Sequence, residues 1–193
     1  MKLIIIVGPH AVGKMTVGQA LSQKTGIPLF HNHVSIELST ELLGPFNDKQ
    51  MALSNALRDV IFDHVAKAHD QGLIFTFMWA FDSPADESYI NRLEKRFKDE
   101  GADVFYVELE ADKEVRWERN HTENRLFHKP TKRNIDRSNH LFTTLEQKYR
   151  LNSYPGEIQK EHYLKINNTH LEPNLVADQI ISHFQWLKED HHG

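Results

Sequence analysis

Cysteine is absent from this 193-residue chain, which excludes disulfide bonds, thiolate metal sites and cysteine nucleophiles. Long apolar runs are absent too, since none approaches the ~20 residues that a helix needs to cross a bilayer. Met1 leads directly into an expected strand, with no signal peptide ahead of it. The sequence therefore predicts a cytoplasmic protein that does not bind membranes.

An excess of positive charge is also missing. Lys and Arg number 23 against 27 Asp and Glu, and the net charge of −4 argues against a nucleic-acid partner. The basic residues are nonetheless concentrated, because residues 113–137 hold eight of them against four acidic ones, a surplus of four. Apolar residues make up 39% of the chain, which is enough for a single core, so we expect one domain over residues 1–193.

Strand-like and helix-like segments alternate along the chain, which is typical of βαβ units around a parallel sheet. The expected strands cover residues 2–7, 28–30, 73–79, 104–109 and 163–166. The expected helices cover about residues 14–24, 35–43, 49–70, 84–100, 112–119 and 134–150, with a last one from about 173. An apolar stripe in the third helix is expected to face the core, and it consists of Leu53, Leu57, Val60, Ile61, Val65 and Ala68. The last helix is expected to bury Leu175, Val176, Ile180, Ile181, Phe184 and Leu187.

A glycine-rich loop follows the first expected strand and carries the strongest signal in the chain. It reads Gly-Pro-His-Ala-Val-Gly-Lys-Met-Thr over residues 8–16. Glycines at its first and sixth places let backbone N–H groups turn toward an anion, Lys14 adds a positive charge, and the following helix adds its dipole. The alternative is a tight turn with a chance lysine, but strand, loop and helix come in the required order. We expect a nucleotide phosphate site made by Gly8, His10, Ala11, Val12, Gly13, Lys14, Met15 and Thr16.

The loop departs from the common pattern, because Met15 stands where Ser or Thr usually follows the lysine and Thr16 comes next. This spacing resembles that of the nucleoside monophosphate kinases. The order of elements is similar to that of these enzymes and of shikimate kinases over nearly the whole chain. The resemblance implies an α/β, three-layer P-loop fold with a five-stranded parallel sheet of order 2-3-1-4-5, a helical lid, and ATP with Mg²⁺. It also implies that Thr16 grips the α-phosphate while magnesium is held largely through water.

The resemblance further assigns residues to the nucleotide. Arg119 stands where these kinases place an arginine over the adenine ring, and Arg125 falls near a phosphate-binding arginine of the lid, expected over about residues 119–133. Asn168 follows the fifth strand, where the family often contacts adenine. The alternatives are a solvated charged helix for the arginines and an ordinary polar turn for Asn168.

Asp82 comes shortly after the expected strand over residues 73–79, near where the phosphate loop should emerge. A carboxylate there could hold a magnesium-bound water or accept a proton from a substrate hydroxyl. The alternative is a turn residue before the helix that Ser83 should cap.

The acceptor is expected between the end of the second strand and the helices over about residues 33–71. His31 and His33 could accept a proton near neutral pH, and Asn32 could fix a hydroxyl group. Shikimate kinases have acids at this place, so the departure argues against shikimate itself. Arg58 could clamp an acidic group of the substrate, although arginines at the edge of an apolar stripe often only extend to solvent. The histidines could equally cap the following helix.

Together these residues predict a kinase that moves the γ-phosphoryl group of ATP to a hydroxyl or phosphate of a small molecule. The expected catalytic groups are Lys14, Asp82, His33 and Arg125, with Thr16 and Asp82 at the metal. A nucleotide-dependent switch without an acceptor is the main alternative, and nucleic-acid end modification is a weaker one. We expect a monomer or a homodimer.

Overall fold

The computed structural model describes residues 1–45, 47–68, 70–122 and 134–186. Its five strands form one parallel sheet in the order β2-β3-β1-β4-β5, which confirms the predicted fold class and strand order. The strands are β1 (Lys2–Val7), β2 (Leu29–His31), β3 (Gly72–Thr76), β4 (Asp103–Glu110) and β5 (Tyr163–Asn167). The helices are α1 (Lys14–Thr25), α2 (His33–Leu43), α3 (Asp48–Ala68), α4 (Pro84–Asp99), α5 (Lys113–Arg119), α7 (Ile135–Lys148) and α8 (Pro173–Phe184).

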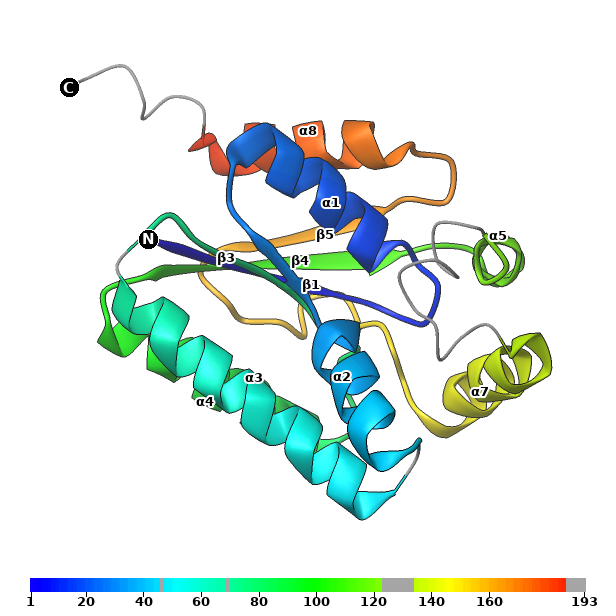
Figure 1. Cartoon of the computed structure of the whole chain (residues 1–193). Coiled ribbons are helices and arrows are strands. Elements are labelled where there is room, and N and C mark those ends of the chain that lie inside the picture. Colours follow the sequence, from blue (N-terminus) through cyan, green and yellow to red (C-terminus); the bar gives the residue numbers. More distant parts are fainter. Residues whose placement is uncertain (46, 69, 123–133, 187–193) are drawn as a thin grey trace.

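The central strand β1 shows how the three layers form. Its side chains alternate between the two faces of the sheet, so Ile4 and Ile6 join one buried cluster while Leu3 and Ile5 join another. The first cluster includes residues of α1 and α8, and the second includes residues of α3 and α4. Figure 1 shows these two pairs of helices on opposite faces of the sheet, with α5 and α7 beyond the carboxyl end of β4.

Local signals in the sequence fix several boundaries. Ser83 accepts a hydrogen bond from the Asp86 amide at 3.4 Å and Pro84 begins α4, as the capping pattern predicts. Gly26 ends α1 in the left-handed conformation, with φ of 74°. The prediction for the third strand is wrong at its end, because β3 stops at Thr76 rather than near residue 79.

The predicted core stripe of α3 is wrong for most of its members. The residues that α3 buries are Gln50, Ser54, Arg58, Phe62 and Ala66. Val60 of the predicted stripe is 57% exposed, Ala68 is exposed, and Leu53 and Leu57 are only partly buried. Ile61 and Val65 are partly buried and pack against the core cluster as predicted. The first half of α3 therefore packs its polar side against its neighbour α2. Helical periodicity alone cannot show which side of a helix is buried.

The prediction for α8 holds for most of its inner face. Val176, Ile180 and Ile181 are buried, and Phe184 is partly buried against the same cluster. Leu175 is 53% exposed, so its prediction is wrong, and Leu187 lies outside the described residues. Over the described part of the chain, no helix is both long enough and apolar enough to cross a membrane.

Candidate nucleotide and acceptor site

The phosphate loop leaves β1 through a tightly constrained backbone. Gly8 has a φ of 139°, and a Cβ atom there would lie 2.4 Å from the Leu109 carbonyl oxygen of β4. Gly13 has a φ of 105° and Ala11 has a φ of 59°, a value that few residues with a side chain adopt. The loop thus needs glycine at its first place, because only glycine allows the close approach to β4.

Lys14 and the start of α1 supply positive charge at this loop. Lys14 Nζ donates hydrogen bonds to the carbonyl oxygens of Gly8 at 2.6 Å and Pro9 at 2.7 Å, which hold the ammonium group over the loop. The N-cap residue of α1 is Gly13, so no side chain caps the first N–H groups of the helix. An uncapped helix start beside a lysine is the arrangement that binds phosphate groups.

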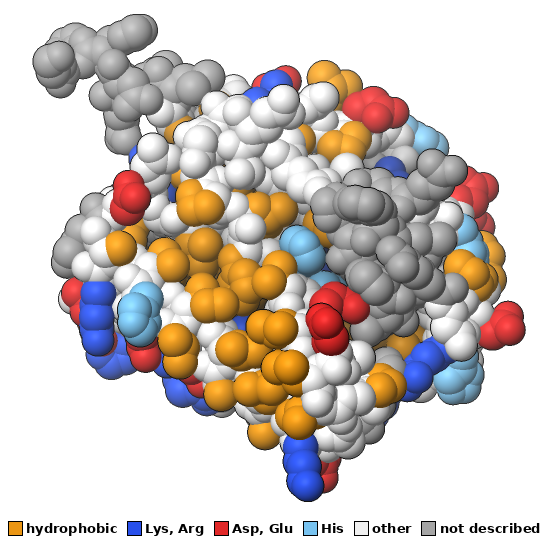
Figure 2. All heavy atoms as spheres, viewed as in Figure 1, with side chains coloured by type: hydrophobic (Ala, Val, Ile, Leu, Met, Phe, Trp, Pro, Cys, Tyr) orange, Lys and Arg blue, Asp and Glu red, His pale blue; other side chains and the backbone are white. Residues whose placement is uncertain are grey.

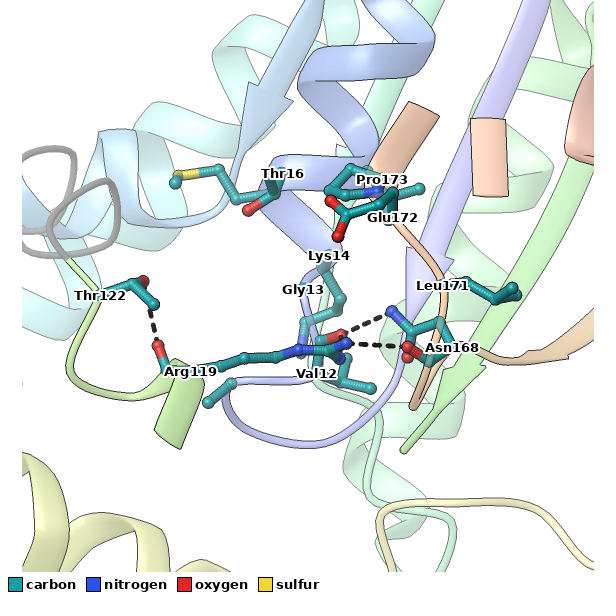
Figure 3. A pocket seen from close by; sticks show the side chains of 13 residues that line it. Val12, Gly13, Lys14, Thr16, Arg119, Thr122, Asn168, Leu171, Glu172 and Pro173 are labelled. Carbon is teal, nitrogen blue, oxygen red and sulfur yellow. Dashed lines mark hydrogen bonds between the residues drawn. The ribbon is translucent and has the colours of Figure 1, made fainter. Parts of the chain in front are cut away.

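A cavity of about 300 Å³ opens directly at this loop. Figure 3 shows the Arg119 side chain extended along one side of it, with the guanidinium group toward Val12 and Asn168, and the Thr16 and Glu172 side chains on the other side. The lining residues are Ala11, Val12, Gly13, Lys14, Met15, Thr16, Val17, Arg119, Thr122, Asn168, Leu171, Glu172 and Pro173. The structure therefore brings the loop residues 11–17 together with Arg119 and Asn168, the two residues that the resemblance assigns to the nucleotide.

Arg119 is held in place by backbone oxygens of the phosphate loop and of the turn after β5. Its guanidinium group donates to Val12 O at 3.2 Å, to Asn168 O at 2.8 Å and to Thr169 O at 3.2 Å. Burial lowers the pKa of the Arg119 guanidinium, and the charge of Glu172 opposes this effect. The group stays positively charged and presents a planar surface next to the phosphate loop.

The Asn168 side chain joins the end of β5 to the loop, because its Nδ2 donates to Val12 O at 2.9 Å. It is 3% exposed, and its Oδ1 is buried without a hydrogen-bond partner among the described residues. The same Val12 carbonyl thus accepts from both Asn168 and Arg119. This shared acceptor couples three segments that are far apart in the sequence.

Arg116 has a different role from the one its place in the basic region suggests. It is 6% exposed, forms a bidentate ion pair with Glu146 of α7 at 2.6 and 3.0 Å, and donates to His10 O at 3.4 Å. Its guanidinium also lies over the Phe142 ring, 5.3 Å from the centroid. Arg116 therefore ties α5 and α7 to the phosphate loop, and this contact positions Arg119 one turn further along α5.

Sequence reasoning missed several lining residues, of which Glu172 matters most. It occupies the N-cap position of α8, but its side chain makes no cap hydrogen bond there. Its carboxylate instead lies at the cavity and interacts with the charge of Arg119. The available signal was position, because Glu172 follows β5 and the carboxyl ends of parallel strands carry ligand sites.

The predicted acceptor residues lie two strands away from the phosphate loop. His31 ends β2 and pairs in register with Thr76, the last residue of β3. The Asn32 amide donates to Thr76 Oγ1 at 3.3 Å, and His33 Nδ1 lies 3.5 Å from Glu37 Oε1. Because β3 separates β2 from β1, these groups are roughly 10 Å from the loop along the same edge of the sheet.

Arg58 is buried between α2 and α3, at 6% exposure. Its guanidinium donates to Ser35 Oγ at 2.8 Å, to Asn32 O at 3.2 Å and to Asn55 Oδ1 at 3.4 Å. Burial lowers the pKa of Arg58, and the nearby Tyr89 hydroxyl opposes this effect. The side chain therefore organises the chain around Asn32, where the predicted acceptor residues lie.

Asp82 is not brought to the cavity. Because β3 ends at Thr76, Asp82 lies in a turn six residues beyond the strand, and its carboxylate accepts a hydrogen bond from the Arg150 amide at 3.0 Å. The side chain is exposed there. The expectation that Asp82 lies just beyond a strand ending at residue 79, near the phosphate loop, is thus corrected.

Arg125 and most of the predicted lid, residues 123–133, lie outside the described residues. Among the residues that the structure describes, no group of three or more His, Asp and Glu side chains is close enough to hold a metal ion. The cavity lining includes the Thr16 hydroxyl, which is the predicted metal ligand, and the Glu172 carboxylate. One hydroxyl suits Mg²⁺, which keeps several waters and is often bound mainly through substrate phosphates.

Comparisons with known proteins find relatives at the level of structure. No family model matches the sequence, and no curated protein matches it either. A putative kinase from Chloroflexus aurantiacus is similar, with a TM-score of 0.63 and 18% identity over 96% of both chains. A gluconokinase from Sinorhizobium meliloti is similar with a TM-score of 0.61 and 18% identity, covering 98% of this chain and 94% of its own.

A shikimate kinase from Bacteroides thetaiotaomicron is also similar, with a TM-score of 0.57 and 19% identity, covering 97% of this chain and 98% of its own. Identities this low establish the fold and leave the reaction to the site residues. The predicted resemblance is confirmed at that level: the chain has the fold of the P-loop kinases related in structure to shikimate kinase and gluconokinase.

Proposed function

We propose that the protein transfers the γ-phosphoryl group of ATP to a hydroxyl or phosphate group of a small molecule. The observation that carries the proposal is the convergence of Lys14, Arg119 and Asn168 on one cavity at the uncapped start of α1. Kinase names among the structural neighbours support the same reaction class.

The roles of the loop residues follow from charge and position. The loop amides and the start of α1 bind phosphate oxygens, and Lys14 neutralises charge that builds up on the transferred group. Lys14 would exchange its contacts with Gly8 O and Pro9 O for phosphate oxygens when a nucleotide binds. Arg119 presents its guanidinium plane to the nucleobase, and the backbone carbonyls that it contacts fix its orientation.

Thr16 is the proposed protein contribution to the metal site, through its hydroxyl or through water. Mg²⁺ bound with the nucleotide supplies further positive charge to the outer phosphates. Asp82 was expected at this metal, and we leave it out of the proposed machinery because its carboxylate is engaged by the Arg150 amide. Arg125 keeps the proposed role of a phosphate-binding arginine.

His31, Asn32 and His33 are the proposed acceptor residues. They follow β2 at the same edge of the sheet as the loop, and the Asn32 carbonyl is held by Arg58. His33 could accept the proton of an attacking hydroxyl, since a neutral imidazole is a base near pH 7. The neighbouring Glu37 carboxylate would orient the ring and stabilise its charged form.

The test is incubation of the protein with ATP, Mg²⁺ and a panel of sugars, sugar acids, cyclitols, nucleotides and aminoglycosides, scored by ADP release. We expect one compound class to raise ADP release above the background rate, with the Lys14→Ala variant as the blank. If every compound leaves the rate unchanged while ATP still binds, the nucleotide-dependent switch becomes the better interpretation. If the folded protein does not bind ATP at all, both interpretations fail.

A further inference from the structure

Glu172 places a negative charge at a cavity whose other charged groups suit an anion. Figure 2 shows acidic side chains spread over the outer surface of the molecule, where water and salt screen their charge. Glu172 differs, because it is the one acid among the 13 described residues that line the cavity with Lys14 and Arg119. A carboxylate close to bound phosphates weakens their binding by repulsion. A contact with an uncharged, hydrogen-bond-donating part of the nucleotide would offset that cost.

The Glu172 carboxylate is available for such a contact. The residue stands at the N-cap position of α8 without forming a cap hydrogen bond, and its carboxylate accepts no hydrogen bond from any residue that the structure describes. Glu172 is exposed, so a ligand in the cavity can reach it. An ionised carboxylate only accepts hydrogen bonds, so it favours amino groups and repels carbonyl oxygens.

The surroundings of Glu172 suit a flat ring. Leu171 and Pro173 flank it in the sequence, and both line the cavity. Figure 3 shows Glu172 and Pro173 across the cavity from Arg119, whose planar guanidinium can stack on a base. A nucleobase needs apolar or planar groups against its faces and polar groups at its edge. This part of the cavity therefore fits the base, while Lys14 and the loop fit the phosphates.

The backbone carbonyls beside Arg119 have no capacity left to recognise a base. Val12 O accepts from Arg119 at 3.2 Å and from Asn168 Nδ2 at 2.9 Å. Asn168 O accepts from Arg119 at 2.8 Å and from the Leu171 amide at 3.3 Å. A carbonyl oxygen has two lone pairs, so both of these acceptors are filled. Recognition of an amino group on the base then falls to side chains, and the Glu172 carboxylate is the strongest acceptor among them.

We propose that Glu172 accepts a hydrogen bond from the 6-amino group of adenine and thereby selects ATP over nucleotides that carry an oxygen at this position. The inference rests on the proposed function, because it requires a nucleotide in this cavity. Adenine presents a donor at C6, whereas hypoxanthine and guanine present a carbonyl oxygen there. In the same pose that oxygen would face the carboxylate, and two acceptors repel each other.

The experiment compares ATP with ITP, the nucleotide of hypoxanthine. Both carry the same triphosphate and the same charge, so a difference in affinity reports on the base alone. Calorimetric titration of the full chain with each nucleotide, in the presence of Mg²⁺, gives the two dissociation constants. We expect ATP to bind at least about tenfold more tightly than ITP, because a hydrogen bond to a charged group is among the stronger ones.

The variant that tests the assignment is Glu172→Gln. Its amide can both donate and accept, so the ratio of the two affinities should fall to about one. Loss of the negative charge should tighten both nucleotides together, which is why the ratio is the readout. The matched control is Asp178→Asn, which removes an acid of the same helix that pairs with Lys24 at 2.9 Å outside the cavity lining, and the ratio should persist there. Thermal unfolding confirms that both variants are folded.

Three outcomes would overturn the inference. The first is equal affinity of the natural sequence for ATP and ITP. The second is a preference for ATP that Glu172→Gln leaves unchanged. The third is tighter binding of GTP than of ATP that Glu172→Gln abolishes, which would assign the carboxylate to the N1–H and 2-amino groups of guanine. A nucleotide still binds in all three cases, so the kinase proposal stands, whereas a folded protein that binds no nucleotide overturns both.

Discussion

The phosphate loop and the α2–α3 pair both follow the ends of parallel strands, but different groups hold them in place. In the loop, backbone conformation dominates: Gly8 and Gly13 have φ values of 139° and 105°, and Lys14 and Arg119 bond to backbone carbonyls. In the α2–α3 pair, side chains bond to side chains, as with Gln50 and Ser39. A site determined by backbone conformation leaves a local pattern in the sequence. A network of side chains can be predicted only when the packing of both helices is known.

We expect the largest loss of stability from a substitution at Gly8, where the backbone leaves no room for a side chain. Gly8→Ala should lower the free energy of unfolding by about 3 kcal/mol or more and abolish nucleotide binding, because the new Cβ would meet the Leu109 carbonyl at 2.4 Å. The matched control is Gly101→Ala, where φ is 77° but no atom lies within 4 Å of the new Cβ, so only strain of about 1 kcal/mol is added. Urea unfolding gives the stability of each variant, and ATP titration gives its nucleotide affinity. Equal losses for the two variants would contradict the steric argument.

The next effect concerns charge at the loop. Lys14→Ala should leave unfolding nearly unchanged but reduce turnover by about 10²-fold, the usual cost of deleting one charge donor to a transition state. The control is Lys24→Ala at the other end of α1, where the ammonium pairs with Asp178 at 2.9 Å on the surface. Steady-state ADP release with the best acceptor is the measurement. Full activity in a folded Lys14→Ala protein would refute the phosphate-loop assignment.

These differences explain which parts of the structure the sequence can predict. The loop and the capping by Ser83 depend on short-range patterns, whereas the strand order was implied by the family resemblance, and the structure agrees with all three. The α3 prediction failed in the first half of the helix because an apolar stripe is taken as core by default, yet there Ser35 and Ser39 of α2 make the polar side of α3 the buried one. Glu172 was missed because its place at the cavity depends on how α8 meets the loop.

The third prediction concerns Arg58, the buried cation between α2 and α3, which we expect to stabilise the fold. Arg58→Met keeps the volume but removes the charged donor that the Asn32 carbonyl and the Ser35 hydroxyl share, so we expect a loss of about 2 kcal/mol in the free energy of unfolding. Arg96→Met is the control, since Arg96 pairs with Asp59 and Asp63 near the surface and such pairs contribute about 1 kcal/mol or less. Denaturant unfolding of both variants gives the comparison. If Arg96→Met costs as much as Arg58→Met, the buried network is not what holds the two helices together.

The smallest effect concerns the hydrogen bond between Gln50 and Ser39, which a double-mutant cycle distinguishes from the separate contributions of the two side chains. Ser39 and Gln50 are 0% and 3% exposed and bond to each other at 2.7 Å, so Ser39→Ala should cost about 1 to 2 kcal/mol by leaving the Gln50 amide buried without a partner. Combining it with Gln50→Leu removes both polar groups, and the double variant should be more stable than the sum of the single losses by at least about 0.5 kcal/mol. A double-mutant cycle by urea unfolding, with Thr143→Ala on the exposed side of α7 as the control, measures the difference. Strictly additive losses would show that this buried contact contributes nothing specific to the pairing of α2 with α3, and the side-chain network would then have to act through Arg58, Ser35 and Ser54 alone.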